Sequence, residues 1–186
     1  MIRTITRAIT RPITRAITRA FEKTRYLIDL NGTDAYYELA QPITFTGDFE
    51  VELDFLTVDV VGAVLVGDSH STSYFVKLNE TNINVWVAGV QFNFVFAAGA
   101  YHEGSLHHLL LRLTGADLEV TIDGVSLGVQ VITPYTGANN FLIGNSNSVA
   151  NYFNGIIANV KFTDLGSQLF STFTSLDAGS SYSSGV

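Results

Sequence analysis

Hydrophobic and polar residues alternate through most of this 186-residue chain. The clearest run is FEVELDF at residues 49–55, in which four apolar residues alternate with three acidic ones. Successive side chains of a β-strand point to opposite faces, so this run predicts a strand with one buried face and one exposed acidic face. Similar runs predict further strands at residues 63–67, 74–79, 83–87, 92–96, 109–113, 118–122, 141–143 and 156–162.

Turn-forming residues separate these runs. The segments TGAD at 114–117, DG at 123–124 and TGANN at 136–140 are rich in Gly, Asn and Asp. No segment shows a clean helical stripe of useful length. Roughly ten short strands separated by regular turns predict an all-β fold, an antiparallel sandwich of two sheets.

The N-terminal segment follows a different period, four residues long. Isoleucine recurs at one position of the repeat and arginine at another: Ile5, Ile9, Ile13, Ile17 and Phe21, with Arg7, Arg11, Arg15 and Arg19 between them. In a helix, Ile and Arg would lie about 200° apart, but threonine is a poor helix former and Pro12 interrupts a continuous helix. In a strand, Ile and Arg alternate along one face. We expect an extended or partly helical basic arm.

Charge divides the chain at the end of this arm. Residues 1–25 hold seven of the ten basic residues and one of the seventeen acidic ones, a net charge of +6. Residues 26–186 hold the other three basic and sixteen acidic residues, a net charge of −13. We therefore predict an arm for anchoring or assembly at 1–25, a β-sandwich at 26–175 and a Ser/Gly-rich tail at 176–186.

The arm has three interpretations. A short polar repeat is commonly an unstructured tail. The regular isoleucines favour an arm held by neighbouring subunits, with Ile as apolar contacts and Arg paired to carboxylates of the partner. A basic arm also suits nucleic acid, but the absence of aromatic residues before Phe21 and the acidic body argue against that partner. We expect the nine repeat residues listed above to bind a protein partner, which includes further copies of the chain.

Composition narrows the class of protein. The chain has no cysteine, so disulfides and thiolate metal sites are excluded. No stretch approaches the roughly 20 apolar residues needed to cross a bilayer, and no secretory signal is recognisable, so we expect no membrane partner and synthesis in a cytoplasm.

Four motifs carry a resemblance to a known fold. The segment LNGTDAYYEL at 30–39, followed by FTGDF at 45–49, resembles the opening "DGxDDYVxL…FTxSxW" of laminin G-like, concanavalin A-like jelly rolls. Likewise, LHHLLL at 106–111 resembles their "WHHVAV" strand and LEVTIDG at 118–124 their "LxLYVDG" strand, while FLIGN at 141–145 and YFNGIIANV at 152–160 resemble "IGG…YFxGxIDEVR". The resemblance implies a jelly roll of two stacked, curved antiparallel sheets. This fold hosts lectins, hydrolases and inert spacers, so it implies no chemistry by itself.

A catalytic role finds little support. The segment ELDFLT at 52–57 matches the first two positions of the laminarinase-like motif ExDxxE, but Thr57 stands where the acid/base glutamate belongs. His107 and His108 are adjacent in a strand, so they point to opposite faces and cannot chelate one metal. We predict no enzymatic activity, no catalytic residues and no cofactor. Many laminin G modules bind Ca²⁺, but Ser73 occupies the aspartate position and Asp68 lies five residues earlier, which leaves Ca²⁺ as a poorly supported alternative.

Two loops rich in Ser and Asn offer weak candidates for glycan binding. They contain the five candidate residues Asp68, His70, Asn145, Asn147 and Tyr152. A separate, strongly apolar segment around Phe92, Phe94 and Phe96 predicts either a strand buried on both faces or a subunit contact.

The arm, the jelly roll and the missing catalytic set together resemble virion proteins of tailed bacteriophages, such as capsid decoration proteins, head fibres and tail fibres or other tail appendages. The resemblance implies a non-enzymatic structural protein on the virion surface, made in the host cytoplasm, anchored to capsid or tail by its arm, and displaying a sandwich for weak adhesion to glycans. Its partners would be other virion proteins, further copies of itself and glycans. The alternatives are a free lectin-like carbohydrate-binding module and, with less support, a polysaccharide hydrolase of the laminarinase-like fold.

Overall fold

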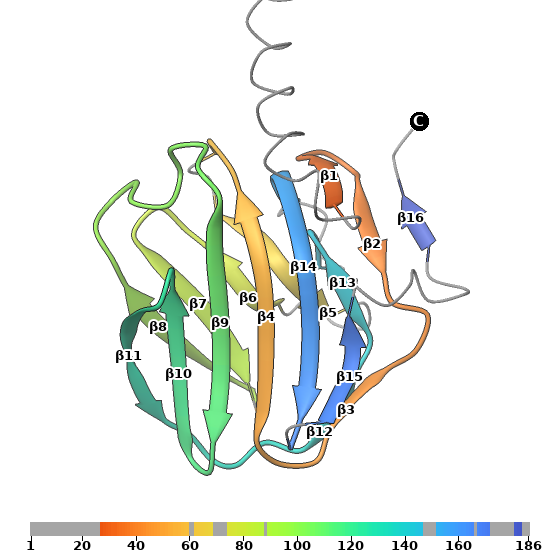
Figure 1. The fold of residues 1–186 in the computed structure, drawn as a ribbon, viewed down its shortest axis with the longest axis vertical. Helices are drawn as coiled ribbons and strands as arrows, with labels where there is room; N and C mark the ends of the chain where they lie inside the picture. Colours follow the sequence, from red (N-terminus) through yellow and green to blue (C-terminus); the bar gives the residue numbers. More distant parts are fainter. Residues whose placement is uncertain are drawn as a thin grey trace, which may run out of the picture.

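The computed structural model describes residues 27–59, 62–68, 74–87, 89–146, 152–165, 167–171 and 181–183. The expectations for the arm, for His70 and for Asn147 lie outside these residues. The described residues form two antiparallel sheets stacked face to face, with no helix among them (Figure 1). The prediction of an all-β, two-sheet sandwich is confirmed.

The first sheet faces the viewer in Figure 1 and its strands run nearly vertically. From edge to edge it contains β1 (Leu27–Asn31), β14 (Asn154–Asp164), β4 (Phe49–Leu56), β9 (His107–Thr114), β10 (Asp117–Ile122) and β11 (Val125–Val131), and β15 (Ser167–Ser171) also pairs with β14. The long strand β14 pairs with β1 through its first half and with β15 through its second.

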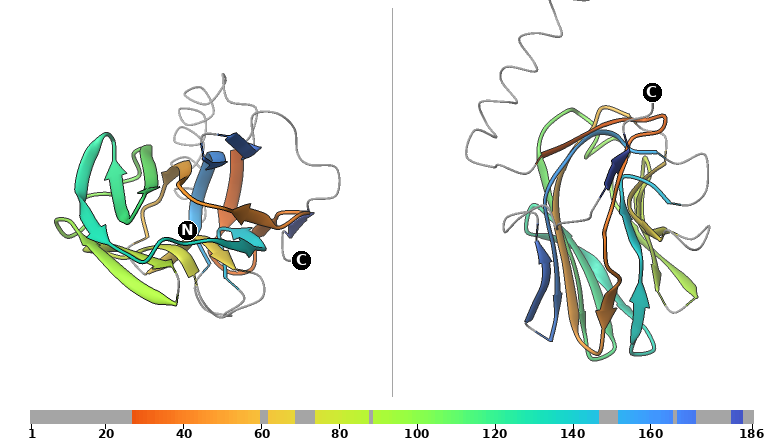
Figure 2. Two further views of the ribbon diagram at one scale, coloured as in Figure 1. Left: turned by 90° about the horizontal axis from the view of Figure 1, so that it is seen from below. Right: turned by 90° about the vertical axis from the view of Figure 1, so that its right-hand side faces the viewer.

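The second sheet lies behind the first, as the side view in Figure 2 shows. It contains, in spatial order, β16 (Ser181–Ser183), β2 (Tyr36–Glu38), β13 (Phe141–Ile143), β5 (Ala63–Asp68), β6 (Tyr74–Leu78), β7 (Asn82–Val87) and β8 (Val90–Val95). A separate pair joins β3 (Ile43–Phe45) to β12 (Gly137–Asn139).

The core fills the space between the sheets. From Phe49 to Phe55 of β4 the apolar residues are fully buried and the acidic ones half-buried, as the alternating sequence predicts. Aromatic rings concentrate near the start of β4, where Phe45 stacks on Phe49 with centroids 4.4 Å apart and Phe141 stacks on Phe162 at 4.8 Å. Burial of these apolar and aromatic side chains stabilises the described residues.

All nine predicted strands exist, and the described residues form seven more that the alternation did not predict. Several of the additional strands are only three residues long, too short to show a period of two. The strand β16 pairs Tyr182 with Tyr37 of β2, so part of the segment expected as a tail joins the edge of the sandwich.

The strongly apolar segment around Phe94 corresponds to β8, an edge strand of the second sheet. Phe94 is buried, and Phe92 and Phe96 pack against the core from the same face, whereas Val95 on the other face is 68% exposed. The strand is therefore not buried on both faces. A subunit contact here stays a prediction. Within the described residues, no helix is long and apolar enough to cross a membrane.

Candidate functional site

The acidic face of β4 is an ion-pair ladder. Glu50 Oε1 accepts a hydrogen bond from Arg112 Nε of β9 at 2.7 Å, and Glu52 Oε1 accepts one from Lys161 Nζ of β14 at 2.8 Å. Residues 26–186 contain only three Lys and Arg residues, and two of them pair with this row. Each of these two carboxylates is thus paired with a cation on a neighbouring strand, as on a solvated sheet face.

The third carboxylate of the row, Asp54, is held from both sides. Its Oδ1 lies 2.7 Å from Nδ1 of His108, and its Oδ2 accepts a hydrogen bond from the Asn159 amide. Asn159 sits at a bulge in β14 with a positive φ of 53°, a conformation that asparagine tolerates better than most residues. The bulge turns this amide onto Asp54.

Thr57 closes the end of β4 and has a structural role. Its side chain is buried, Oγ1 donates a 2.7 Å hydrogen bond to the Asn154 carbonyl, and it accepts one of 3.0 Å from the Asp59 N–H. The position at which a laminarinase-like enzyme would carry its acid/base glutamate is thus occupied by a hydroxyl that ties β4 to β14.

The two adjacent histidines point to opposite faces, as predicted. His107 is buried and its Nδ1 lies 2.7 Å from Asp123 Oδ2, while the exposed His108 donates its backbone N–H to Asp123 Oδ1 at 2.8 Å. Asp123 occupies the β10–β11 turn with φ of 53° and Gly124 follows with φ of 77°, as a type I′ Asp-Gly turn requires. Burial raises the pKa of Asp123, but the hydrogen bonds from both histidines and their electrostatic attraction outweigh it, so its pKa lies below the usual range.

His107 also lies close to a second carboxylate. Its Nε2 is 3.0 Å from Glu103 Oε1, but the pair lacks hydrogen-bond geometry, so we treat it as an electrostatic contact only. The sequence separates His107 from Asp123 by sixteen residues, and only the Asp-Gly turn signals that they meet. The cluster fixes the end of β9 to the turn and contains no nucleophile.

The predicted glycan candidates gather in part. After Gly144 the chain passes over Gly67, where a methyl group would collide with the Asn145 carbonyl. This close approach places Asn145 and Ser146 beside Gly67, the residue before Asp68 at the end of β5. Tyr152 is half-buried and directly precedes Phe153, whose N–H donates to the Gly144 carbonyl at 2.9 Å. We call Asp68, Asn145 and Ser146 the loop rim.

The loop rim contains two buried polar atoms without a partner. Asn145 and Ser146 are 5% and 1% exposed, and neither Asn145 Oδ1 nor Ser146 Oγ makes a hydrogen bond with any residue that the structure describes. A buried polar group left unpaired costs about 1–3 kcal/mol and calls for an explanation. Asn145 was a candidate from the sequence, whereas Ser146 was not, because nothing local distinguishes it from other loop serines.

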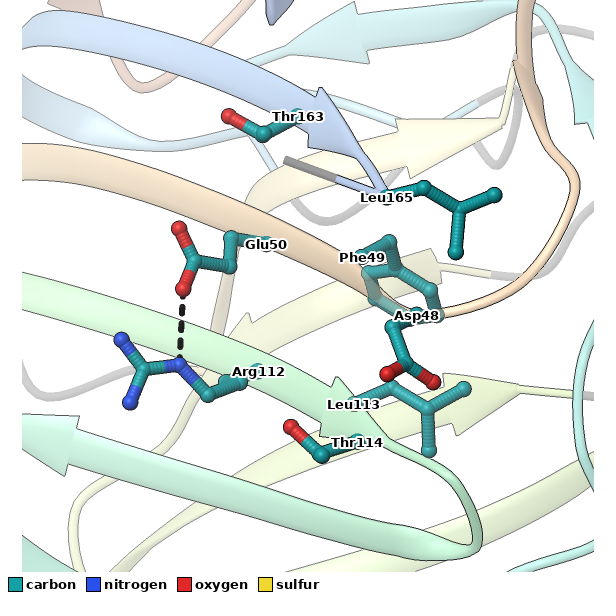
Figure 3. A pocket seen from close by; sticks show the side chains of 8 residues that line it. All are labelled: Asp48, Phe49, Glu50, Arg112, Leu113, Thr114, Thr163 and Leu165. Atoms are coloured by element: carbon teal, nitrogen blue, oxygen red, sulfur yellow. Dashed lines mark hydrogen bonds and ion pairs between the residues drawn. The ribbon is translucent and has the colours of Figure 1, made fainter. Parts of the chain in front are cut away.

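A pocket of about 340 Å³ lies where β4 begins and β9 and β14 end. Figure 3 shows the Glu50–Arg112 ion pair on one side of it and the apolar side chains of Leu113 and Leu165 on the other. Asp48 Oδ1 accepts the Gly115 N–H at 2.7 Å and so holds the β9–β10 turn at the rim of this pocket. No local pattern in the sequence predicts this pocket, because its lining comes from three separate strands.

The described residues contain no group of three His, Asp or Glu side chains that could hold a metal ion. Asp68, the nearest acidic residue to the expected Ca²⁺ position, belongs to no such group.

Residues 31–165 match the laminin G-type branch of the concanavalin A-like lectin/glucanases superfamily. The chain belongs to this superfamily. The match covers most of the sandwich, and it confirms the laminin G-like, concanavalin A-like jelly roll that four short motifs had implied.

Solved structures of the superfamily share the fold at low identity. Domains LG4-5 of the mouse laminin α1 chain match with a TM-score of 0.59 and 17% identity, covering 84% of this chain and 45% of that one. The LG1-3 region of the laminin α2 chain matches with a TM-score of 0.63 and 17% identity over 83% of this chain and 29% of that one. The chain thus spans less than half of the laminin fragments it matches.

A third structure is a domain of a carbohydrate-active enzyme. Domain 4 of AbnA, a GH43 extracellular arabinanase from Geobacillus stearothermophilus, was solved in complex with arabinotriose, and it matches with a TM-score of 0.57 and 17% identity over 76% of this chain and 71% of that one. No curated protein sequence matches the chain. The concanavalin A-like fold is therefore shared with carbohydrate-binding domains.

Proposed function

We propose that the protein is a non-enzymatic structural protein of a tailed-bacteriophage virion. The basic N-terminal arm attaches it to the capsid or tail, and the concanavalin A-like sandwich is displayed on the particle, where the loop rim holds glycans weakly. This assignment joins the charge division of the sequence, +6 in the arm against −13 in the rest, to the membership of the sandwich in a lectin-type superfamily.

The observation that carries the non-enzymatic assignment is the ladder on β4. Retaining glycoside hydrolysis needs two carboxyl groups about 5–5.5 Å apart, one of them kept protonated by an apolar pocket. Here Glu50 and Glu52 each bind a cation on a neighbouring strand. Thr57 stands at the acid/base position, and its hydroxyl donates a hydrogen bond to the Asn154 carbonyl of β14.

The unpaired atoms of the loop rim support glycan adhesion. Sugar hydroxyls both donate and accept hydrogen bonds, so they match the chemistry of the two orphaned oxygens, Asn145 Oδ1 and Ser146 Oγ. Both oxygens are buried, so their side chains must shift outward to meet a glycan. The nearby Asp68 adds a carboxylate, which accepts hydrogen bonds from sugar hydroxyls. The low number of groups fits weak, multivalent attachment rather than tight binding.

A glycan array with the full-length protein tests the rim. We expect selective hits whose signal falls at least tenfold in Ser146→Ala, because the variant removes a hydrogen-bonding oxygen. The same change should leave the free energy of unfolding unchanged or raise it, because it also removes an unsatisfied buried hydroxyl.

Thr114→Ala in the pocket of Figure 3 is the matched control, since it removes a threonine hydroxyl from a different site. Loss of glycan binding in this control but not in Ser146→Ala would contradict the rim assignment. Immunogold electron microscopy of particles from cells that express the chain tests the virion assignment, and absence of label from purified particles would contradict it.

A free lectin-like module is the second candidate, favoured by the arabinotriose complex of the AbnA domain. Both a free lectin and the proposed virion protein would bind glycans, so glycan binding alone does not distinguish them. The location of the protein does, because a free lectin would be absent from purified particles. A laminarinase-like hydrolase would release reducing ends from β-glucans and lose that activity in Glu52→Gln, and we expect no release from the unmodified protein.

A further inference from the structure

We propose that the edge strand β11 is the acceptor for the N-terminal arm of a second copy of the chain, which adds to the first sheet as a further strand. This inference rests on the proposed role of the arm as an attachment element, and it names the surface that the arm binds.

The strand β11 is open on one side. It is the last strand of the first sheet, and within the described part of the chain its backbone ladder is made with β10 alone. The second sheet approaches β11 through β8, so the inner side of the edge is covered, but the outward side chains remain free. Val129 is 52% exposed and Val131 is 76% exposed. An exposed edge with apolar side chains is a template for an added strand.

The neighbouring strand supplies charge beside these valines. In the β10–β11 register, Glu119 lies opposite Val129 and Asp117 lies opposite Val131. The outer face at this edge therefore presents two acidic residues next to two valines. Glu119 accepts one hydrogen bond from Ser126 at 2.6 Å, and no cation pairs with Glu119 or Asp117 among the described residues.

The arm presents the complementary pattern when it is extended. Residues of one parity, such as Ile9, Arg11 and Ile13, then lie on one face about 6.6 Å apart. When an isoleucine of the arm lies beside one of the two valines of β11, the next arginine lies beside the other valine. The long arginine side chain can then extend across β11 to the carboxylate that β10 places opposite that valine. The β-branched isoleucines and threonines of the arm favour the extended state.

Pro12 fits this arrangement and limits it. Pro12 has an even residue number, whereas the isoleucines and arginines of the repeat have odd numbers. In an antiparallel strand, alternate residues direct their backbone N–H groups to opposite sides, so the nitrogen of Pro12 points away from β11 when those of the odd residues point toward it. Proline on the outer edge blocks the addition of yet another strand. The arm can thus join the sheet once and end it there.

The position of the arm on its own molecule favours a second copy. The arm leads into β1, at the edge of the first sheet opposite to β11, and five strand spacings separate these edges, about 24 Å. Between Phe21 and Leu27 the chain spans at most about 22 Å, so the last repeat cannot reach its own β11, and an earlier repeat reaches it only by passing over a face of the sandwich. Copies placed side by side bring the arm of one to β11 of the next without a crossing of the sheet face.

The edge strand β8 of the second sheet lacks the chemistry for arginine. On the outer face of β8, Gln91 donates to Asn93 at 2.9 Å and Val95 is exposed, and the outer residues of the adjacent β7 are uncharged. Val95 on β8 is therefore the matched control for Val131 on β11.

Sedimentation velocity of the full-length protein tests the proposal between about 5 and 200 µM. We expect the mass to rise with concentration, and the double variant Val129→Lys/Val131→Lys to weaken association at least tenfold. Val95→Lys should associate like the unmodified protein. A protein that stays monomeric over this range, or one that associates equally well in both variants, overturns the proposal.

Charge reversal tests the partner segment in the same assay. The arm variant Arg7→Glu/Arg11→Glu and the body variant Asp117→Lys/Glu119→Lys should each associate poorly alone, and their mixture should associate again. Failure of the mixture to recover assigns the arm to another surface and overturns the proposal. Neither assay depends on glycan binding or on virion location, so its failure is distinguishable from failure of the proposed function.

Discussion

At the scale of single residues, buried carboxylates and turns hold the ends of the strands together. Asp164, at the end of β14, is 8% exposed and binds the chain before β4: its Oδ1 accepts the Thr46 N–H at 2.7 Å and its Oδ2 accepts the Thr46 hydroxyl at 2.6 Å. Burial raises the pKa of Asp164, but these hydrogen bonds and one from the Gly47 N–H outweigh it, so its pKa lies below the usual range. The ionised carboxylate is therefore part of the fold.

This lowered pKa predicts loss of stability in acid. An unfolded aspartate titrates near pH 3.9, so the contribution of Asp164 is complete above that pH and disappears as the pH falls through its lower folded value. Asp164→Asn should cost about 1–3 kcal/mol at pH 7, because the amide cannot accept every donor. Urea unfolding at a series of pH values from 7 to 2.5 gives the free energy of unfolding, which should fall less with decreasing pH in this variant than in the unmodified protein. The exposed Glu80→Gln should follow the unmodified protein, and a parallel curve for Asp164→Asn would contradict the assignment.

At the scale of elements, the alternation of the sequence sets which face of a strand is buried. It predicted β4 and most of the long strands, because their buried faces face a common core. It could not predict that β4, β9 and β14 are neighbours, since the pairing of Glu52 with Lys161 joins residues 109 apart. The three-residue strands β2, β3, β12 and β16 were missed because their pairing partners, rather than their own sequences, make them strands.

Adjacent residues of β4 should therefore respond very differently to truncation. Leu53 is fully buried, so Leu53→Ala removes core packing and should lower the free energy of unfolding by about 2–5 kcal/mol. Glu52→Ala removes a surface ion pair and should cost less than about 1 kcal/mol. Chemical denaturation of both variants checks the contrast. Similar losses at the two positions would show that the outer face of β4 is not a solvated one.

At the scale of the whole molecule, the sequence revealed the sandwich and the charge division, but not the candidate site. Asn145 was recognised as a loop residue, yet its significance comes from the close approach of its segment to Gly67, which no local pattern encodes. The charges have a simpler logic. Two of the three cations of the body lie in ion pairs on β4, and no ion pair of the described residues involves Asp117 or Glu119, so the acidic residues at the β11 edge remain available for the arginines of another copy.

The central claim is that a cationic arm joins this acidic sandwich to its neighbours, and salt tests it most directly. Ion pairs between exposed groups weaken as the Debye length shrinks from about 10 Å at 0.1 M salt to about 3 Å at 1 M. Sedimentation velocity of the full-length protein at one fixed concentration should therefore show oligomers at 50 mM NaCl and mostly monomers at 1 M NaCl. A single monomeric species at both salt concentrations would contradict the account.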